Sequence, residues 1–345
     1  MSGHSRRRFL HYAALTSMAT AMTTDAETLA GSGGPENADP KLEAAQDKSS
    51  RKFTMDLRTG SIGVGGDQLR QIELAAAHGF ESVNAEGEFL VRLPSSERRE
   101  MPEILKSKGL VWGAAGLTVE FRRDETTFAD SLKPFTEIAQ ALKESGVTRV
   151  GTWLMPFHQE MPYVANFRQH ARRLRECSKI MQDHGLRFGM EYVGPKTLWA
   201  SSRHSFIHSM VETKELIAEI GLDNVGIVLD SWHWYTAHES LSDLLSLKAS
   251  DVVACDLNDA PSGKEIDQQI DSQRELPMAT GVIDLKGFLG ALIEIGYDGP
   301  VRAEPFNAAL NAMDDDQATA ATATAMKSAF SLVDGDISPG SKPER

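Results

Sequence analysis

The sequence contains only two cysteines, Cys177 and Cys255, and no Cys-x-x-Cys pair. Nothing therefore points to a disulfide framework or to a zinc–thiolate site. Positive charge is also scarce, because 36 lysines and arginines stand against 49 acids, for a formal net charge of −13. A nucleic-acid partner would need a basic stripe to contact its phosphates, so this balance argues against one.

Long apolar runs are missing too. The N-terminal run ends at Met22 and is too short to span a bilayer as a stable helix, so we expect no stable membrane insertion. Its context resembles a twin-arginine export signal, since Arg6 and Arg7 precede Phe9 and Leu10 in "SRRRFL". We expect cleavage near residues 19–21 and a periplasmic location through that pathway.

From residue 52 onward one pattern repeats: a short apolar run, a longer stretch of helical periodicity, and another short run. Residues 1–24 are then the signal, 25–51 a flexible linker, 52–332 the folded domain and 333–345 a disordered tail. Strands are expected at 52–57, 81–86, 111–116, 149–154, 187–192, 225–230, 252–257 and 300–304.

Eight such units in about 280 residues favour one α/β domain, a (β/α)8 TIM barrel. An open doubly wound sheet would need a glycine-rich phosphate turn after the first strand. The segment "TGSIGVGG", 59–66, is rich in glycine but lacks that spacing. Several helical stretches end in glycine just before the next strand, as in "SGV", "HGL" and "IGL", which is typical of helix C-caps.

Acids follow the apolar runs at the end of the last four strands: Glu191, Asp230, Asp256 and Glu304. Glu86 holds a similar place after the second strand and has an equally good structural explanation. Strand ends converge at one face of a barrel, and four acids together would repel each other unless a cation lay among them. Oxygen ligands favour Mg²⁺ or Mn²⁺.

Four motifs resemble, in this order, the sugar phosphate isomerase/epimerase family with its xylose-isomerase-like barrel. They are "FGMEYVGP", "VLDSWHWY", "ACDLNDA" and "VRAEPF", and the similarity extends over about 52–332. The resemblance implies a metal held by Glu191, Asp230, the strand-7 residue and Glu304. It also implies that Glu191 and Glu304 act as the acid/base pair.

The seventh strand departs from the family pattern. Family members usually carry His-x-x-Asp there, whereas this chain has Asp256 in the histidine position and Asp259 three residues later. Two interpretations stay open: Asp256 replaces the imidazole as a hard ligand, or the metal site is degraded.

Four further residues are candidate substrate contacts. His233, three residues after Asp230, would hydrogen-bond a substrate oxygen, and Trp232 would form part of the wall of the cleft or pack against a helix. His158 lies after the fourth strand, and Arg274 follows the seventh near a family position that binds substrate oxygens.

Three functions fit these residues. The first is a metal-dependent isomerase or epimerase acting on a small sugar or polyol by proton transfer next to a carbonyl. The second is a dehydratase, a lyase acting on a cyclic polyol such as an inosose, because its reaction begins with the same proton abstraction. The third is a catalytically silent, exported sugar-binding protein. The sequence leaves open whether the chain forms a homo-oligomer.

Overall fold

The computed structural model of the protein describes residues 51–334. The expected export signal lies outside the described residues, as do all but one residue of the linker and most of the tail. Helices and strands run from Thr54 to Ser331. No helix in 51–334 combines the length and the apolar character needed to cross a membrane.

The predicted (β/α)8 barrel is confirmed. Parallel strands form one sheet in the order β3-β2-β1-β11-β10-β9-β7-β5-β4. Its two end strands, β3 and β4, are halves of the predicted third strand and are separated by only Gly113 and Ala114, so the sheet closes on itself. The strands are β1 (Thr54–Leu57), β2 (Ser82–Val83), β3 (Val111–Trp112), β4 (Ala115–Gly116), β5 (Arg149–Trp153), β7 (Arg187–Glu191), β9 (Val225–Asp230), β10 (Val252–Leu257) and β11 (Pro300–Ala303).

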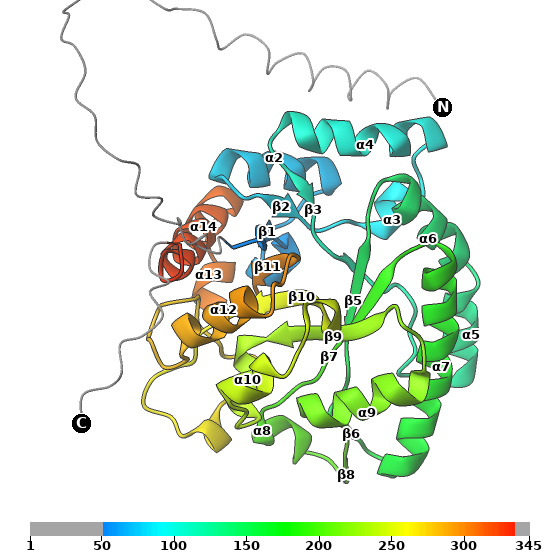
Figure 1. Ribbon diagram of the computed structural model, residues 1–345, viewed down its shortest axis with the longest axis vertical. Coiled ribbons are helices and arrows are strands. Elements are labelled where there is room, and N and C mark those ends of the chain that lie inside the picture. Colours follow the sequence, from blue (N-terminus) through cyan, green and yellow to red (C-terminus); the bar gives the residue numbers. More distant parts are fainter. Residues whose placement is uncertain (1–50, 335–345) are drawn as a thin grey trace, which may run out of the picture. The chain divides into compact units, whose positions relative to one another are not determined.

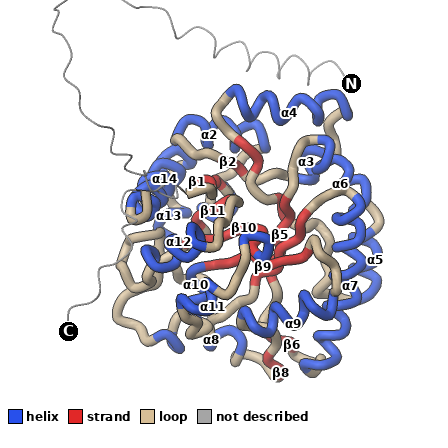
Figure 2. The backbone as a smooth tube through the Cα atoms, viewed as in Figure 1, coloured by secondary structure: helices blue, strands red, loops and turns tan. Residues whose placement is uncertain are grey.

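Helices surround the strands (Figures 1 and 2). Long helices α2, α4, α6, α7, α9, α12 and α14 cover the outside, and shorter ones lie in the loops. The α-helices are α2 (Gln68–His78), α3 (Gly87–Leu90), α4 (Ser95–Ser107), α5 (Glu125–Leu132), α6 (Phe135–Glu144), α7 (Tyr163–Asp183), α8 (Lys196–Trp199), α9 (Met210–Ile220), α10 (Ser231–Thr236), α11 (Leu241–Leu245), α12 (Leu285–Glu294), α13 (Ala308–Asn311) and α14 (Asp315–Ser331). Three 3₁₀ turns are η1 (Thr59–Ile62), η2 (Ala249–Asp251) and η3 (Ile266–Gln268).

Local sequence sets where these helices begin and end. Ser209 caps the start of α9, where its side chain accepts a hydrogen bond from the amide of Glu212. Gly221 ends the same helix with φ of 68°, a left-handed conformation that suits glycine. Gly185, in the predicted "HGL" joint, has φ of 71°. The chain thereby turns back into the next strand within a few residues.

Charged residues occupy one layer inside the barrel. Asp56, Arg302, Asp256 and Asp230 stand in register on the neighbouring strands β1, β11, β10 and β9. Residues in register on neighbouring parallel strands point to the same face, and all four are buried. Such a layer is expensive to bury unless its charges are paired, and Arg302 pairs with Asp256 within it.

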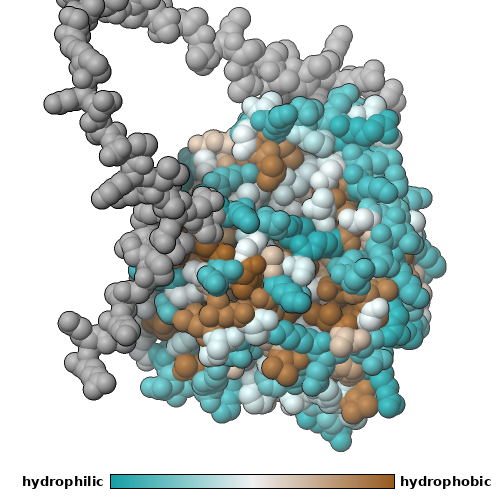
Figure 3. Space-filling model, in the orientation of Figure 1, coloured by the Kyte–Doolittle hydropathy of each residue, from teal (hydrophilic) through white to brown (hydrophobic). Residues whose placement is uncertain are grey.

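Small elements surround the C-terminal ends of the strands. The short strands β6 (Phe157–His158) and β8 (His204–Ser205) form a separate antiparallel pair there. On the face shown in Figure 3, hydrophilic side chains dominate the right-hand edge, where Figure 1 places α5 and α7.

Candidate active site

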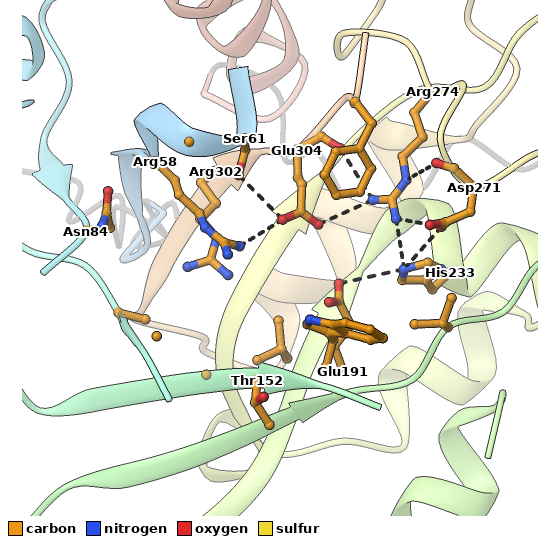
Figure 4. Close-up of a pocket in the computed structure, with 18 of the residues that line it drawn as sticks. Arg58, Ser61, Asn84, Thr152, Glu191, His233, Asp271, Arg274, Arg302 and Glu304 are labelled. Carbon is orange, nitrogen blue, oxygen red and sulfur yellow. Dashed lines mark hydrogen bonds and ion pairs between the residues drawn. The ribbon is translucent and has the colours of Figure 1, made fainter. Parts of the chain in front are cut away.

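A cavity of about 600 Å³ opens at the C-terminal ends of the barrel strands. Both predicted acid/base residues, Glu191 and Glu304, line it together with His233 and Arg274 (Figure 4). Its other polar lining residues are Arg58, Ser61, Asn84, Thr152, Asp271 and Arg302, and its larger apolar ones are Trp153, Met155, Phe157, Val193, Leu198, Val228 and Phe306.

Glu191 ends strand β7 and projects into this cavity. Only 9% of its side chain is exposed, and its buried Oε1 has no hydrogen-bond partner among the described residues. The His233 Nε2 lies 3.8 Å from that oxygen. Burial raises the pKa of Glu191 well above its ordinary value, and the charges of Glu304 and Asp256 add to the effect. The carboxylate is therefore set up to take a proton or a cation.

Glu304 directly follows strand β11 and is better neutralised. Its Oε1 accepts a hydrogen bond from Arg58 at 2.8 Å, and Ser61 donates to the same oxygen at 3.4 Å. The Glu304 backbone N–H donates to Asn258 Oδ1 at 2.9 Å, which holds this strand end in place. These contacts fix the carboxylate at the wall of the cavity.

Asp230 lies behind the cavity wall, fully buried at the end of β9. Its carboxylate accepts hydrogen bonds from the Trp232 amide at 2.7 Å, from Asn258 at 3.0 Å and from Arg274 at 2.7 Å. Burial raises its pKa to about 7, although the Arg274 charge acts in the opposite direction. Asn258 bonds both Asp230 and the backbone of Glu304, so one amide side chain ties two of the acids together.

Arg274 lies in the long loop that follows β10. Its guanidinium contacts Asp230, Asp271 and His233, with Nη2 2.8 Å from Asp271 Oδ1 and 3.1 Å from His233 Nε2. Its guanidinium carbon lies 4.6 Å from the centroid of the Phe306 ring and 5.7 Å from that of Trp232. The arginine is therefore fixed from several sides while still lining the cavity.

Asp259 holds the base of this loop. Its two carboxylate oxygens accept hydrogen bonds from four backbone amides, at 2.7 to 3.1 Å. Those amides belong to Ala260, Thr280, Gly281 and Ile283. The Asp259 backbone also pairs with Glu275, next to Arg274. One buried acid thus fastens both ends of the loop that presents the arginine.

Asp256 and Arg302 form a buried ion pair on neighbouring strands. Arg302 Nε lies 2.6 Å from Asp256 Oδ1, and Nη2 lies 3.1 Å from Oδ2. The guanidinium lines the cavity, whereas Asp256 is fully buried and stands behind it. Asp256, predicted as the strand-7 ligand, therefore points into the barrel but is engaged through both of its oxygens.

His233 lies in the first turn of α10 and is buried in the cavity wall. Its Nδ1 accepts a hydrogen bond from the Gly194 amide at 3.2 Å, while Nε2 faces Arg274 and Glu191. Burial lowers its pKa well below the ordinary value, and the Arg274 charge lowers it further. The ring is therefore a neutral imidazole at pH 7.

Two overlapping groups of side chains could hold a metal ion. They are Glu191, Asp230 and His233 in one group, and Glu191, Asp256 and Glu304 in the other, with ligand atoms within 4.8 Å of one another in each. The four predicted ligands thus meet as two sets that share Glu191, because the Arg274 guanidinium stands between Asp230 and Glu304, 2.7 and 3.5 Å from their oxygens. The unpartnered Oε1 of Glu191 and the oxygen-rich donors fit a divalent cation.

Two predicted substrate contacts lie elsewhere in the structure. His158 is not among the lining residues; its Nδ1 accepts hydrogen bonds from the amides of Glu160 and Met161 in a turn. Trp232 is fully buried and also not among them, so its ring packs beneath Arg274. Trp153, by contrast, lines the cavity and is 40% exposed.

Sequence reasoning missed Arg58, Arg302, Asn258 and Asp271. Two of them could have been predicted from the spacing. Arg302 stands two residues before Glu304 and Asn258 two residues after Asp256, so each shares the inward face of that acid. Arg58 directly follows the first strand. Asp271 had no such signal, since it lies in a long loop without periodicity.

A closed parallel barrel with carboxylates grouped at the C-terminal ends of its strands defines an α/β-barrel enzyme class with a candidate metal site. The family described as Xylose isomerase-like TIM barrel matches residues 72–329, and the chain belongs to this family.

Similarity to individual proteins agrees with this assignment. The chain is 25% identical to an inosose isomerase of Bacillus velezensis over 248 residues, which cover 69% of this chain and 82% of that protein. It superposes on a xylose isomerase domain protein from Alicyclobacillus acidocaldarius with a TM-score of 0.69 and 29% identity, covering 80% and 97% of the two chains. It also resembles the fold of the IOLI protein solved with a zinc atom, with a TM-score of 0.67, 20% identity and coverage of 81% and 98%.

Proposed function

We propose that the protein is a divalent-metal-dependent isomerase or epimerase that moves a proton next to the carbonyl of a small sugar or polyol. The observation that carries this proposal is the pair of buried carboxylates, Glu191 and Glu304, lining one cavity from different strands. The inosose isomerase activity of the Bacillus velezensis relative supports the same chemistry.

The metal would be held by Glu191, Asp230, Asp256 and Glu304. The unpartnered oxygen of Glu191 and its raised pKa support this, because a cation there would stabilise the ionised carboxylate. Oxygen donors favour Mg²⁺ or Mn²⁺ over softer ions, and the zinc in the IOLI protein supports a divalent ion in this fold. When bound, such an ion polarises a carbonyl oxygen and acidifies the adjacent C–H bond.

The residues that line the cavity would transfer the proton, bind the substrate and exclude water. Glu191 and Glu304 would remove a proton from the substrate carbon and return it, because they are the carboxylates that line the cavity close together. Neutral His233 and the Arg274 guanidinium would hold substrate oxygens. Trp153 and Phe306 would contact the C–H faces of the substrate and exclude water.

Deuterium exchange provides the test. The purified protein is incubated in D₂O with Mn²⁺ and a panel of ketoses and inososes, and carbon-bound deuterium is followed by NMR. An isomerase or epimerase incorporates deuterium and yields a product of unchanged formula, whereas a dehydratase yields a product that has lost water. If substrates bind but none of them incorporates deuterium, the result would contradict the proposal and support the interpretation as a catalytically silent sugar-binding protein.

We further propose export through the twin-arginine pathway, on the basis of Arg6 and Arg7. That pathway carries folded proteins, so a metal site would be loaded before crossing. Replacing both arginines with lysine should retain the protein in the cytoplasm, as measured by cell fractionation. Unchanged export of the double variant would contradict this localisation.

A further inference from the structure

Asp256 and Arg302 are joined more tightly than other charges at the site. They stand opposite each other on β10 and β11, and the guanidinium binds both carboxylate oxygens through parallel N–H groups. Both residues come from strands and both are buried, so neither can move away without disturbing the barrel. Arg274 differs, because it comes from a loop and divides its donors between Asp230 and Asp271, while its guanidinium also contacts His233.

This pairing changes the charge that Asp256 presents to the cavity. An arginine stays protonated at any ordinary pH, so the pair has zero net charge. A carboxylate nevertheless has about four lone-pair sites, and the two bonds from Arg302 leave sites on its oxygens unused. An Asp256 oxygen also lies within 4.8 Å of ligand oxygens of Glu191 and Glu304.

We propose that Asp256 and Arg302 together act as one neutral oxygen ligand. The carboxylate would contribute an oxygen to the ion while Arg302 cancels its charge, so Asp256 would add no net negative charge to the set of ligands. Arg302 is then a positioning residue that sets both the orientation and the effective charge of its partner. This inference rests on the metal binding proposed above, but not on the identity of the substrate.

The test measures Mn²⁺ binding by the purified full-length protein, with electron paramagnetic resonance counting the free ion. Three variants distinguish the contribution of the oxygen at position 256 from that of the charges of Asp256 and Arg302. They are Asp256→Asn; Asp256→Asn with Arg302→Met; and Asp256→Ala with Arg302→Met. Arg149→Met is the matched control, because Arg149 pairs with Asp298 at 2.6 Å but does not line the cavity. Thermal unfolding midpoints confirm that each variant is folded.

Asp256→Asn alone should weaken Mn²⁺ binding about 30-fold, within the ~10–100-fold range for lost partners of metal ligands, because it leaves the Arg302 charge unpaired beside the ion. The Asn/Met double variant keeps a neutral oxygen without that charge and should bind Mn²⁺ to within about 5-fold of the wild type, a change smaller than that ~10–100-fold range. The Ala/Met variant has no oxygen and should stay about 30-fold weaker. Arg149→Met should bind like the wild type.

Two results would overturn the inference alone. Equal affinity of the Ala/Met and Asn/Met variants would show that Asp256 is not a ligand. An Asn/Met variant as weak as Asp256→Asn would show that Arg302 does not set the charge. If the single variant fails to fold, the two double variants are compared with the wild type, and an Asn/Met variant about 30-fold weaker than the wild type overturns the inference. Absence of Mn²⁺ binding by the wild type would overturn the metal proposal as well.

Discussion

The two halves of the cavity differ in chemistry although the same barrel builds both. The half from β7 to β11 presents Glu191 and Glu304, with Asp230 and Asp256 directly behind them. The half from β1 to β5 contributes mostly small or neutral groups: Gly60, Ser61, Asn84, Ala114, Ala115, Gly116, Gly151, Thr152 and Trp153. This difference suggests that proton transfer belongs to the first half and substrate binding to the second, and four sets of variants test how the two halves differ.

The largest effect should come from removing the acids of the charged half. Glu191→Gln and Glu304→Gln should each lower kcat by ~10²–10⁴-fold, the range for general acid–base groups, with a much smaller change in KM. Steady-state kinetics with Mn²⁺ and the substrate found by deuterium exchange provide the measurement. Glu86→Gln is the matched control, because Glu86 also follows a strand but does not line the cavity, and its kcat should change little. Comparable losses in all three variants would contradict the division.

Arg274→Met should destabilise the protein most. It leaves Asp230 and Asp271 without their guanidinium partner, and breaking a buried pair from one side typically costs about 3–5 kcal/mol. Urea unfolding with excess chelator measures the change in the free energy of unfolding. Arg58→Met, in the opposite half, removes a side chain that is 38% exposed and should cost about 1 kcal/mol or less. A larger loss for Arg58→Met than for Arg274→Met would reverse the comparison.

Asp56 is a buried acid on β1, beneath the largely neutral half. Burial raises its pKa to about 6, against the lowering effect of the Arg302 charge. Because its pKa is raised in the folded state, its contribution to stability is present at low pH and is lost as pH rises from about 4 to about 6.

Asp56→Asn removes that titration. As the pH rises from 4 to 7, the wild type should lose this contribution and the variant should not. The free energy of unfolding of the variant, relative to that of the wild type, should therefore rise by up to about 3 kcal/mol, at 1.36 kcal/mol per pKa unit. Urea unfolding at several pH values measures the difference. A difference that does not change with pH would contradict a buried, titrating Asp56.

The smallest effect should come from the aromatic wall. Trp153→Ala removes an exposed ring that lines the cavity, so KM should rise about 10-fold, or ~1.4 kcal/mol, while kcat changes little. His158→Ala is its control, since His158 bonds backbone amides in a turn and does not line the cavity. A larger rise in KM for His158→Ala would restore the substrate contact expected from sequence.

Much of the fold could be predicted from the sequence because the patterns that indicate strands and helices are local and repeated. Apolar runs of strand length alternate with helical periodicity, and glycines such as Gly221 mark the joints. The split of the third strand at Gly113 and Ala114 was not predictable, because two-residue strands have no periodicity to detect. The β6–β8 pair was missed for the same reason.

The candidate site was readable where strands supply it. Glu191, Asp230 and Asp256 close or nearly close their strands, and Glu304 follows directly after its own, so their convergence followed from the barrel alone. The aromatic residues could not be placed in this way. Trp232 and His233 are adjacent in α10, where successive residues point about 100° apart, so only one of them reaches the cavity.

The fastening of the β10 loop by Asp259 has a consequence for protein engineering. Because one carboxylate holds amides near both ends of the loop, residues 262–270 form a cassette that could be exchanged while the barrel stays closed. A library randomised there would vary the surroundings of Arg274 while keeping Glu191 and Glu304 in place.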